Sequence, residues 1–178
     1  MPTITVEDGS GVTNANSYIT LEYFTDYCYD LGLQTAAGLD LEDEDEEPLQ
    51  RAMLRAMAFI ESRDFKGCKA DEDYELEWPR DGVEDRNGYA LDNDEIPTNL
   101  KKAQARASYE EYVDAGCLQK NLARGDLVKM EKIDVLQFEY DPYAPQSTIF
   151  QVVNSYLSGL VKSDGVPGSG SYASVVRT

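Results

Sequence analysis

The side chains that could do chemistry in this sequence are mostly carboxylates. Asp and Glu number 34 against 16 Lys and Arg, and there is no histidine. Without histidine, the chain lacks the usual general base near neutral pH and the commonest zinc ligand. Two acids alone could serve a glycosidase, but carboxylates this abundant single out no pair. We therefore predict that the chain is not an enzyme and has no catalytic residue, metal site or cofactor.

Cysteine and glycine patterns point the same way. Cys28, Cys68 and Cys117 are too widely spaced to form a metal-binding pair. The glycine-rich stretch 165–170 lacks the preceding strand and the lysine and hydroxyl pair of a phosphate-binding loop. Because the sequence does not start with a basic segment followed by an apolar one, we expect no export signal and reduced thiols. No apolar run approaches the roughly 20 residues needed to cross a bilayer, which predicts a soluble protein without membrane contact.

A dense acidic run lies between the first two expected helices. It comprises Asp40, Glu42, Asp43, Glu44, Asp45, Glu46 and Glu47. Carboxylates bind calcium, but this run lacks the glycine turn and the spaced terminal Glu of a calcium loop, so we favour a solvated loop. The pairs Asp71/Asp73 and Asp92/Asp94 have the same deficit. They are expected to form turns, with weak divalent-ion binding as the alternative.

The distribution of charge says more than its total. Residues 1–100 carry 25 Asp and Glu against 7 Lys and Arg, a net charge of −18, whereas residues 101–178 carry 9 of each. Proteins bind nucleic acid largely through Lys and Arg, so the first hundred residues should repel it. The basic cluster is Lys101, Lys102 and Arg106, with Lys120, Arg124, Lys129 and Lys132 further on. We favour a solvated face or subunit salt bridges for this cluster over a weak contact with DNA.

Helical periodicity recurs through the sequence and would position these groups. A first helix is expected to follow Thr20, a natural cap, and to stop at Gly32. A second is expected over 46–60, where two acids and a proline favour helix initiation. The third should run from Pro97 to Gly116. A last one is expected over 149–160.

The period changes toward two after residue 127. Residues 127–133 and 136–140 are β-prone, which predicts a hairpin or a pair of strands. Ile4 and Val6 could add an edge strand. The tail after residue 162 is rich in Gly, Ser and Pro and cannot bury enough apolar surface to fold by itself.

These elements together predict a mainly α fold. It is a small helical bundle with a short β-hairpin, spanning residues 1–162, followed by a flexible C-terminal arm, 163–178. A chain of 178 residues is most economically a single domain. At this length it can bury roughly 70% of its unfolded surface and fold without disulfides.

The single tryptophan lies in the stretch Leu76–Val83. Pro79 favours an extended conformation for Trp78, and Gly82 adds a permissive backbone, so the segment predicts a rigid bend that holds the indole inward. Since aromatic side chains act mostly as large hydrophobic anchors, we favour a core tryptophan over a binding role. Trp78 and Pro79 are therefore expected to be a structural anchor.

The Trp-Pro-Arg bend is also one of several motifs that occur in a recognisable order between Val6 and Val161. They are Asn14–Thr20, the Ala-rich second helix, Phe65-Lys66-Gly67, Trp78-Pro79-Arg80, Ile96–Ala103, the Val/Ile-rich hairpin and a last short amphipathic segment. In this ordered set the chain resembles the head-tail connector, or adaptor, proteins of tailed bacteriophages. Members of that group are often labelled DnaT-like single-stranded DNA-binding proteins. The acidic run and the acidic loop before Trp78 are heavier here than the resemblance leads us to expect.

The resemblance implies a structural protein of the virion. It implies a homo-oligomeric ring, a dodecamer, that sits under the portal protein and receives a stopper, neck or tail-terminator protein. Duplex DNA would pass through its channel without specific binding. The protein would lie at the head-tail interface of the virion, and in the host cytoplasm during assembly.

The C-terminal arm is expected to dock onto the portal. It is flexible by composition and ends in Tyr172, Val175, Val176 and Arg177, an apolar, β-branched terminus suited to adding a strand or filling a groove. A frayed chain end is the alternative. For the whole chain, the alternative function is the one named by the label, a single-stranded DNA-binding module. The charge balance favours the connector, because a binding module needs net positive charge at its contact.

Overall fold

The structure, a computed structural model, describes residues 2–35, 38, 40–85, 87–119, 130–133, 136–139 and 150–162. Contacts divide the chain into two units, one formed by residues 1–121 with 147–162 and the other by residues 122–146 with 163–178. The described elements confirm a mainly α fold with a short antiparallel hairpin. The arm, 163–178, lies outside the described residues.

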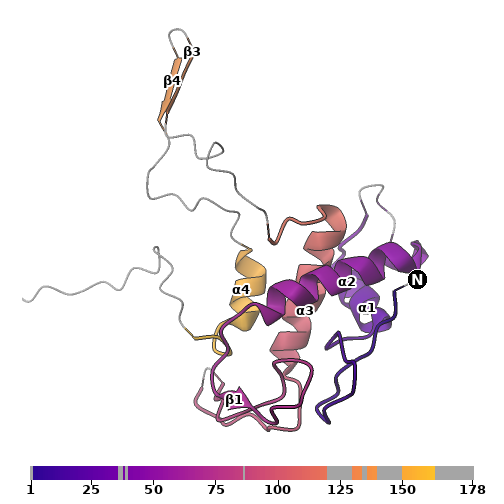
Figure 1. The fold of residues 1–178 in the computed structure, drawn as a ribbon. Coiled ribbons are helices and arrows are strands. Elements are labelled where there is room, and N and C mark those ends of the chain that lie inside the picture. The colour runs from indigo at the N-terminus through magenta and orange to yellow at the C-terminus, as the bar shows by residue number, and fades with distance from the viewer. Residues whose placement is uncertain are drawn as a thin grey trace, which may run out of the picture. The chain divides into compact units, whose positions relative to one another are not determined.

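Four helices form the first unit, together with a short 3₁₀ helix, η1 (Figure 1). They are α1 (Leu21–Asp30), η1 (Leu41–Asp43), α2 (Glu46–Glu61), α3 (Thr98–Val113) and α4 (Gln151–Leu157). The first helix begins and ends where its sequence signals predict. The Thr20 side chain accepts a hydrogen bond from the backbone N–H of Tyr23, and Gly32 adopts a φ of +63° just after the helix.

Helix α3 is the centre of this unit, because α1, α2 and α4 all contact it (Figure 1). Ala103 and Ala107 on α3 are fully buried, and their small side chains allow the neighbouring helices to approach closely. The same helix buries two polar residues, Gln104 and Ser108. Gln104 holds the segment before α1 in place. It donates to the Ser17 hydroxyl at 2.8 Å and accepts from the backbone N–H of Tyr18 at 2.8 Å.

Helix α4 is shorter than the predicted span of 149–160. It ends at Leu157, because the following residues pair with the segment after α2 instead. Lys66 donates its backbone N–H to Leu160, Lys162 donates to Asp64, and Phe65 and Val161 form an antiparallel bridge. These contacts tie the return of the chain to the end of α2.

The predicted hairpin is present as β3 (Met130–Ile133) and β4 (Leu136–Glu139). The strands are antiparallel, with Met130 opposite Glu139 and Ile133 opposite Leu136. Residues 127–129 and Tyr140, which the prediction included, lie outside the described residues.

The edge strand predicted at Ile4 and Val6 is wrong. Within the described N-terminal segment, Val6 forms only an isolated parallel bridge with Ser17. The reason is Glu7, whose fully buried carboxylate accepts hydrogen bonds from the backbone N–H groups of Gly9, Gly11 and Val12. A turn wrapped around a carboxylate replaces the extended chain that a strand needs.

A second antiparallel pair was not predicted. Strands β1 (Cys68–Lys69) and β2 (Arg80–Asp81) are only two residues long, with Cys68 opposite Asp81. Two residues are too few to show a period in the sequence. The pair closes the loop that carries Trp78.

Candidate functional site

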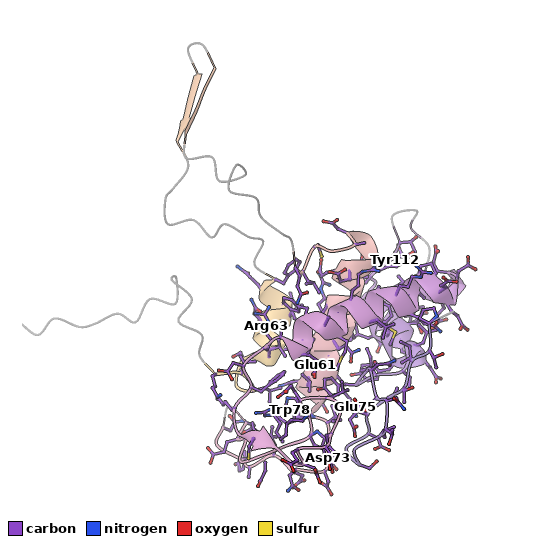
Figure 2. The ribbon with its side chains drawn as sticks, in the orientation of Figure 1. Glu61, Arg63, Asp73, Glu75, Trp78 and Tyr112 are labelled. Atoms are coloured by element: carbon purple, nitrogen blue, oxygen red, sulfur yellow. The ribbon has the colours of Figure 1, made fainter. Side chains whose placement is uncertain are left out.

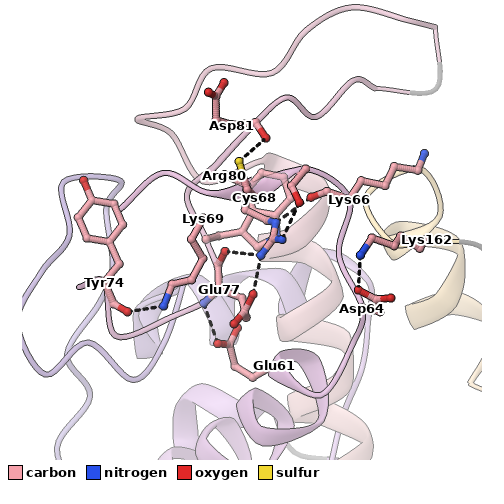
Figure 3. Close-up of polar contacts among 12 residues, drawn as sticks. Glu61, Asp64, Lys66, Cys68, Lys69, Tyr74, Glu77, Arg80, Asp81 and Lys162 are labelled. Atoms are coloured by element: carbon pink, nitrogen blue, oxygen red, sulfur yellow. Dashed lines mark hydrogen bonds and ion pairs between the residues drawn. The ribbon is translucent and has the colours of Figure 1, made fainter. Parts of the chain in front are cut away.

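The Trp78 bend is buried and is held in place by contacts with the segment that follows α2. The indole has no exposed surface and packs edge-on against the Phe65 ring, with ring centroids 5.9 Å apart. The Trp78-Pro79 peptide bond is cis. The buried Arg80 guanidinium donates to the carbonyls of Lys66 and Gly67 and forms an ion pair with Glu77 (Figure 3). These contacts fit a structural anchor and leave the bend no exposed ring for a ligand.

A hydrogen-bonded network joins this bend to Glu61 at the end of α2; Figure 2 labels Glu61 and Trp78. The Tyr18 hydroxyl donates to Glu61 at 2.6 Å and accepts from the backbone N–H of Trp78 at 3.1 Å. The second Glu61 oxygen accepts from the backbone N–H of Glu77 at 2.8 Å (Figure 3). Burial raises the pKa of the Glu61 carboxyl, and burial also raises the pKa of Tyr18 well above its usual value. The network joins the segment before α1, the end of α2 and the bend, so its evident role is structural.

The basic cluster predicted at Lys101, Lys102 and Arg106 lies on one helix, α3. Lys101 and Lys102 are half-buried in its first turns. Hydrogen bonds from Ser10 lower the pKa of the Asp8 carboxyl, and the charge of Lys101 lowers it further. Arg106 forms an ion pair with Glu110 at 2.7 Å, and its guanidinium lies 5.4 Å from the centroid of the Tyr109 ring. Two of the three cations therefore already interact with carboxylates of their own chain.

An aromatic surface forms where tyrosine side chains of α1 and α4 approach each other beside Arg106 of α3. The Tyr27 hydroxyl lies 3.5 Å from that of Tyr156, although 129 positions separate them. Burial raises the pKa of Tyr27 and of Tyr23, and the charge of Arg106 opposes this shift at Tyr27. Sequence reasoning missed this surface, because the spacing of Tyr23 and Tyr27 on one helix gives no sign of their partner from α4. The surface thus combines three tyrosines with one arginine.

Buried Cys28 lies next to this surface. Burial raises the pKa of its thiol to about 12, against a smaller opposing effect of Arg106. Burial therefore favours the protonated thiol, which is the poorly nucleophilic form.

The acidic run is described in part, and its role as a solvated loop stays a prediction. Part of the run folds as η1, whose first residue, Leu41, is buried in the core. A cavity of about 760 Å³ opens at the start of α2, where Arg51 pairs with Glu47 and Arg55 pairs with Glu111. Within the described ranges, no group of three or more Cys, Asp or Glu side chains could hold a metal ion.

Two further sequence predictions concern membranes and the portal. No helix in the described part of the chain is long and apolar enough to span a bilayer. The predicted portal-docking residues Tyr172, Val175, Val176 and Arg177 lie outside the described residues, so their docking role stays a prediction.

A comparison with protein families matches residues 2–178 to the family described as "Putative DnaT-like ssDNA binding protein". The chain belongs to this family. The match includes both units, so membership in the DnaT-like family applies to the helical body and to the hairpin alike. Comparisons with curated proteins and with solved structures find no match. The family description repeats the label of the connector resemblance and names neither a phage nor a connector.

Proposed function

We propose that this member of the DnaT-like family is a structural head-tail connector of a tailed bacteriophage. In this proposal, copies of the chain form a ring, a dodecamer by resemblance, between the portal protein and the neck or tail components. Duplex DNA passes through the channel without specific binding. The protein acts at the head-tail interface of the virion, without cofactor or catalysis.

The proposal rests on the ion pairs that the described arginines of the first unit form. Arg51, Arg55, Arg80 and Arg106 each form an ion pair with a glutamate of the same chain. Residues 1–100 add a net charge of −18. Affinity for DNA comes largely from cations that displace the counterions of phosphates. An acidic body with paired arginines repels a strand, and this property suits a channel wall along which DNA must slide.

Single-stranded DNA binding is the second candidate. The family description names it directly and supports the connector only through the resemblance. The surface formed by Tyr23, Tyr27, Tyr156 and Arg106 is the feature that favours it, since bases stack on aromatic rings and on arginine. Against this stand the ion pair of Arg106 with Glu110 and the carboxylates of α1.

Two measurements on the purified chain separate the candidates. Electron microscopy and light scattering, with the portal protein present and absent, should reveal rings. Fluorescence anisotropy with a labelled oligothymidylate should give no submicromolar affinity at physiological salt. Submicromolar binding that Tyr156→Ala abolishes, and that the exposed-tyrosine control Tyr29→Ala retains, would establish the second candidate instead.

Weak binding at low salt would still leave the connector in place. We expect any such binding to fall steeply with added salt and to depend on Lys101, Lys102 and Arg106. Replacing each by alanine should weaken it, whereas Lys66→Ala, in the loop after α2, should not.

A further inference from the structure

Tyr89 lies near the tip of a loop whose described residues are linked by hydrogen bonds. Its side chain is 71% exposed, the highest exposure among the large hydrophobic side chains of the described surface. The Asp85 carboxylate accepts from the backbone N–H groups of Asn87 and Tyr89, and the Leu91 N–H donates to the Val83 carbonyl at 2.8 Å. Because these hydrogen bonds hold the described residues around Tyr89 before any partner arrives, the ring is presented at low entropic cost.

A cavity of about 330 Å³ lies beside the stem of this loop. Its lining combines apolar side chains, among them Leu91, Ile96 and Leu160, with the carboxylate residues Asp85 and Glu95. The start of α3 and the turn after α4 complete it. All of these residues belong to the first unit.

Charge selects the kind of side chain that fits this loop cavity. Residues 81–95 contain six carboxylates and a single basic residue, Arg86, a net charge of −5. The N-terminus of α3 contributes roughly half a positive charge, which is smaller than the two negative charges at the cavity. The balance therefore favours a cation. Apolar walls suit the methylene stem of a long basic side chain, whose charged end stays near water.

We propose that the loop cavity receives an arginine side chain of a partner protein. Arginine fits better than lysine, because its planar guanidinium can donate to two carboxylates at once and can also stack on an aromatic ring. Tyr89, whose backbone N–H donates to Asp85 at the cavity, supplies an exposed ring on the same loop. The carboxylates around the cavity repel a nucleic-acid strand, which favours a protein partner. The loop is thus a recognition site for a basic protein surface.

The described arginines of a second copy are poor sources of that side chain. Arg51, Arg55, Arg80 and Arg106 are each engaged in an ion pair, and Arg63 lies 3.9 Å from the centroid of its own Phe59 ring. We assign the arginine to a different protein, and its assignment as the portal or neck protein rests on the proposed connector function.

The first test uses a small probe and does not depend on the connector function. N-acetyl-arginine amide is titrated into the full chain while methyl NMR signals are recorded. We expect saturable shifts at Leu91, Ile96 and Leu160. N-acetyl-citrulline amide has nearly the same shape without the charge and should produce none. Shifts of equal size with citrulline, or shifts spread over the acidic run instead, would overturn the proposal.

Two variants examine the residues assigned to the site. Glu95→Gln and Tyr89→Ala should each weaken binding of the arginine probe about threefold, as expected for a partly exposed contact. Both residues are exposed, so the thermal midpoint should stay unchanged. Tyr29→Ala, which removes another exposed tyrosine at the end of α1, should bind the probe like the wild type. Wild-type affinity in both site variants would refute the proposal.

A last measurement keeps the two proposals apart. Binding of the purified portal and neck proteins is compared for the wild type, Glu95→Gln and Tyr29→Ala. Binding that only Glu95→Gln weakens supports the inference. If the wild type takes up the arginine probe but binds neither protein, the connector function fails and the arginine site stands. Portal or neck binding that is unaffected by Glu95→Gln removes the loop cavity from the interface.

Discussion

At the scale of single residues, Trp78 gives the clearest expectation. Trp78→Ala should lower the free energy of unfolding by about 3–5 kcal/mol, because it leaves a large cavity beside Phe65. Trp78→Phe should cost less, since the indole Nε1 has no hydrogen-bond partner among the described residues. Urea unfolding measures both, with Tyr29→Ala as the exposed control. An unchanged unfolding free energy with lost assembly would make Trp78 an interface residue.

Glu61 should make stability depend on pH in an unusual direction. Burial raises the pKa of its carboxyl above the usual 4.5, so the native state binds this proton more tightly than the unfolded chain does. Its contribution to stability should therefore grow as the pH falls from neutral through the raised pKa, and should level off below 4.5. A carboxyl whose pKa is lowered in the native state behaves in the opposite way, because its contribution to stability is lost as the pH falls.

Glu61→Gln provides the comparison for this effect. The variant has no proton to bind at this site, so the difference in unfolding free energy between wild type and variant should increase in favour of the wild type as the pH falls. The amide has one acceptor oxygen where the carboxylate has two, so either the Tyr18 hydroxyl or the N–H of Glu77 faces a donor, and the variant should be less stable throughout. A difference that stays constant with pH would show that the Glu61 pKa is not raised.

At the scale of elements, the end of α3 depends on a single carboxylate. Glu111 is almost fully buried, pairs with Arg55, and accepts the backbone N–H groups of Gly116 and Leu118. Glu111→Ala should lower the free energy of unfolding by about 1–3 kcal/mol, because these donors lose their acceptor. Glu110→Ala, one position away and half-buried, is the matched control. It should lower the free energy of unfolding by at most about 1 kcal/mol, the value of a surface ion pair. Equal costs would show that the buried cap does not stabilise the helix end.

The elements also show how far sequence reasoning reaches. The helices were predictable, because their caps and apolar periods are local: Thr20 and Gly32 delimit α1, and the acids before Pro48 open α2. The hairpin was predictable from its change of period. Strands β1 and β2 were not predictable, because each is only two residues long and the two are separated by a loop of about ten residues. Tertiary contacts, and not local sequence, determine whether such short segments pair.

Candidate sites were harder to predict than elements. The inward orientation of Trp78 followed from its neighbours in sequence. The contact of Tyr27 with Tyr156 and the cavity beside Leu91 arise only when distant segments meet. Polar residues such as Gln104 look exposed by type, and their burial depends on partners such as Ser17 that no local pattern reveals.

At the scale of the whole molecule, the proposed function makes the C-terminal arm separable from the folded body. Deleting residues 163–178 should leave a folded protein with an unchanged thermal midpoint. It should no longer attach to DNA-filled heads, and infectivity should fall with it, because the apolar end that orders on the portal is gone. Sedimentation of the truncated protein with purified heads measures attachment. Normal attachment would move portal docking to the helical body.

The first unit is assembled from two separate stretches of chain, and this has a consequence for its synthesis. Phe150, directly before α4, packs against Phe59, and Val161, after α4, pairs with Phe65, yet both follow the whole hairpin segment in the sequence. At translation rates of 5–20 residues per second, roughly two to eight seconds separate the appearance of Val113 from that of Gln151. During that interval the nascent chain carries α1, α2 and α3 without their closing helix. Ribosomes that stop within the hairpin therefore release fragments with an open apolar face, and such fragments should aggregate or be degraded rather than join the assembling particle.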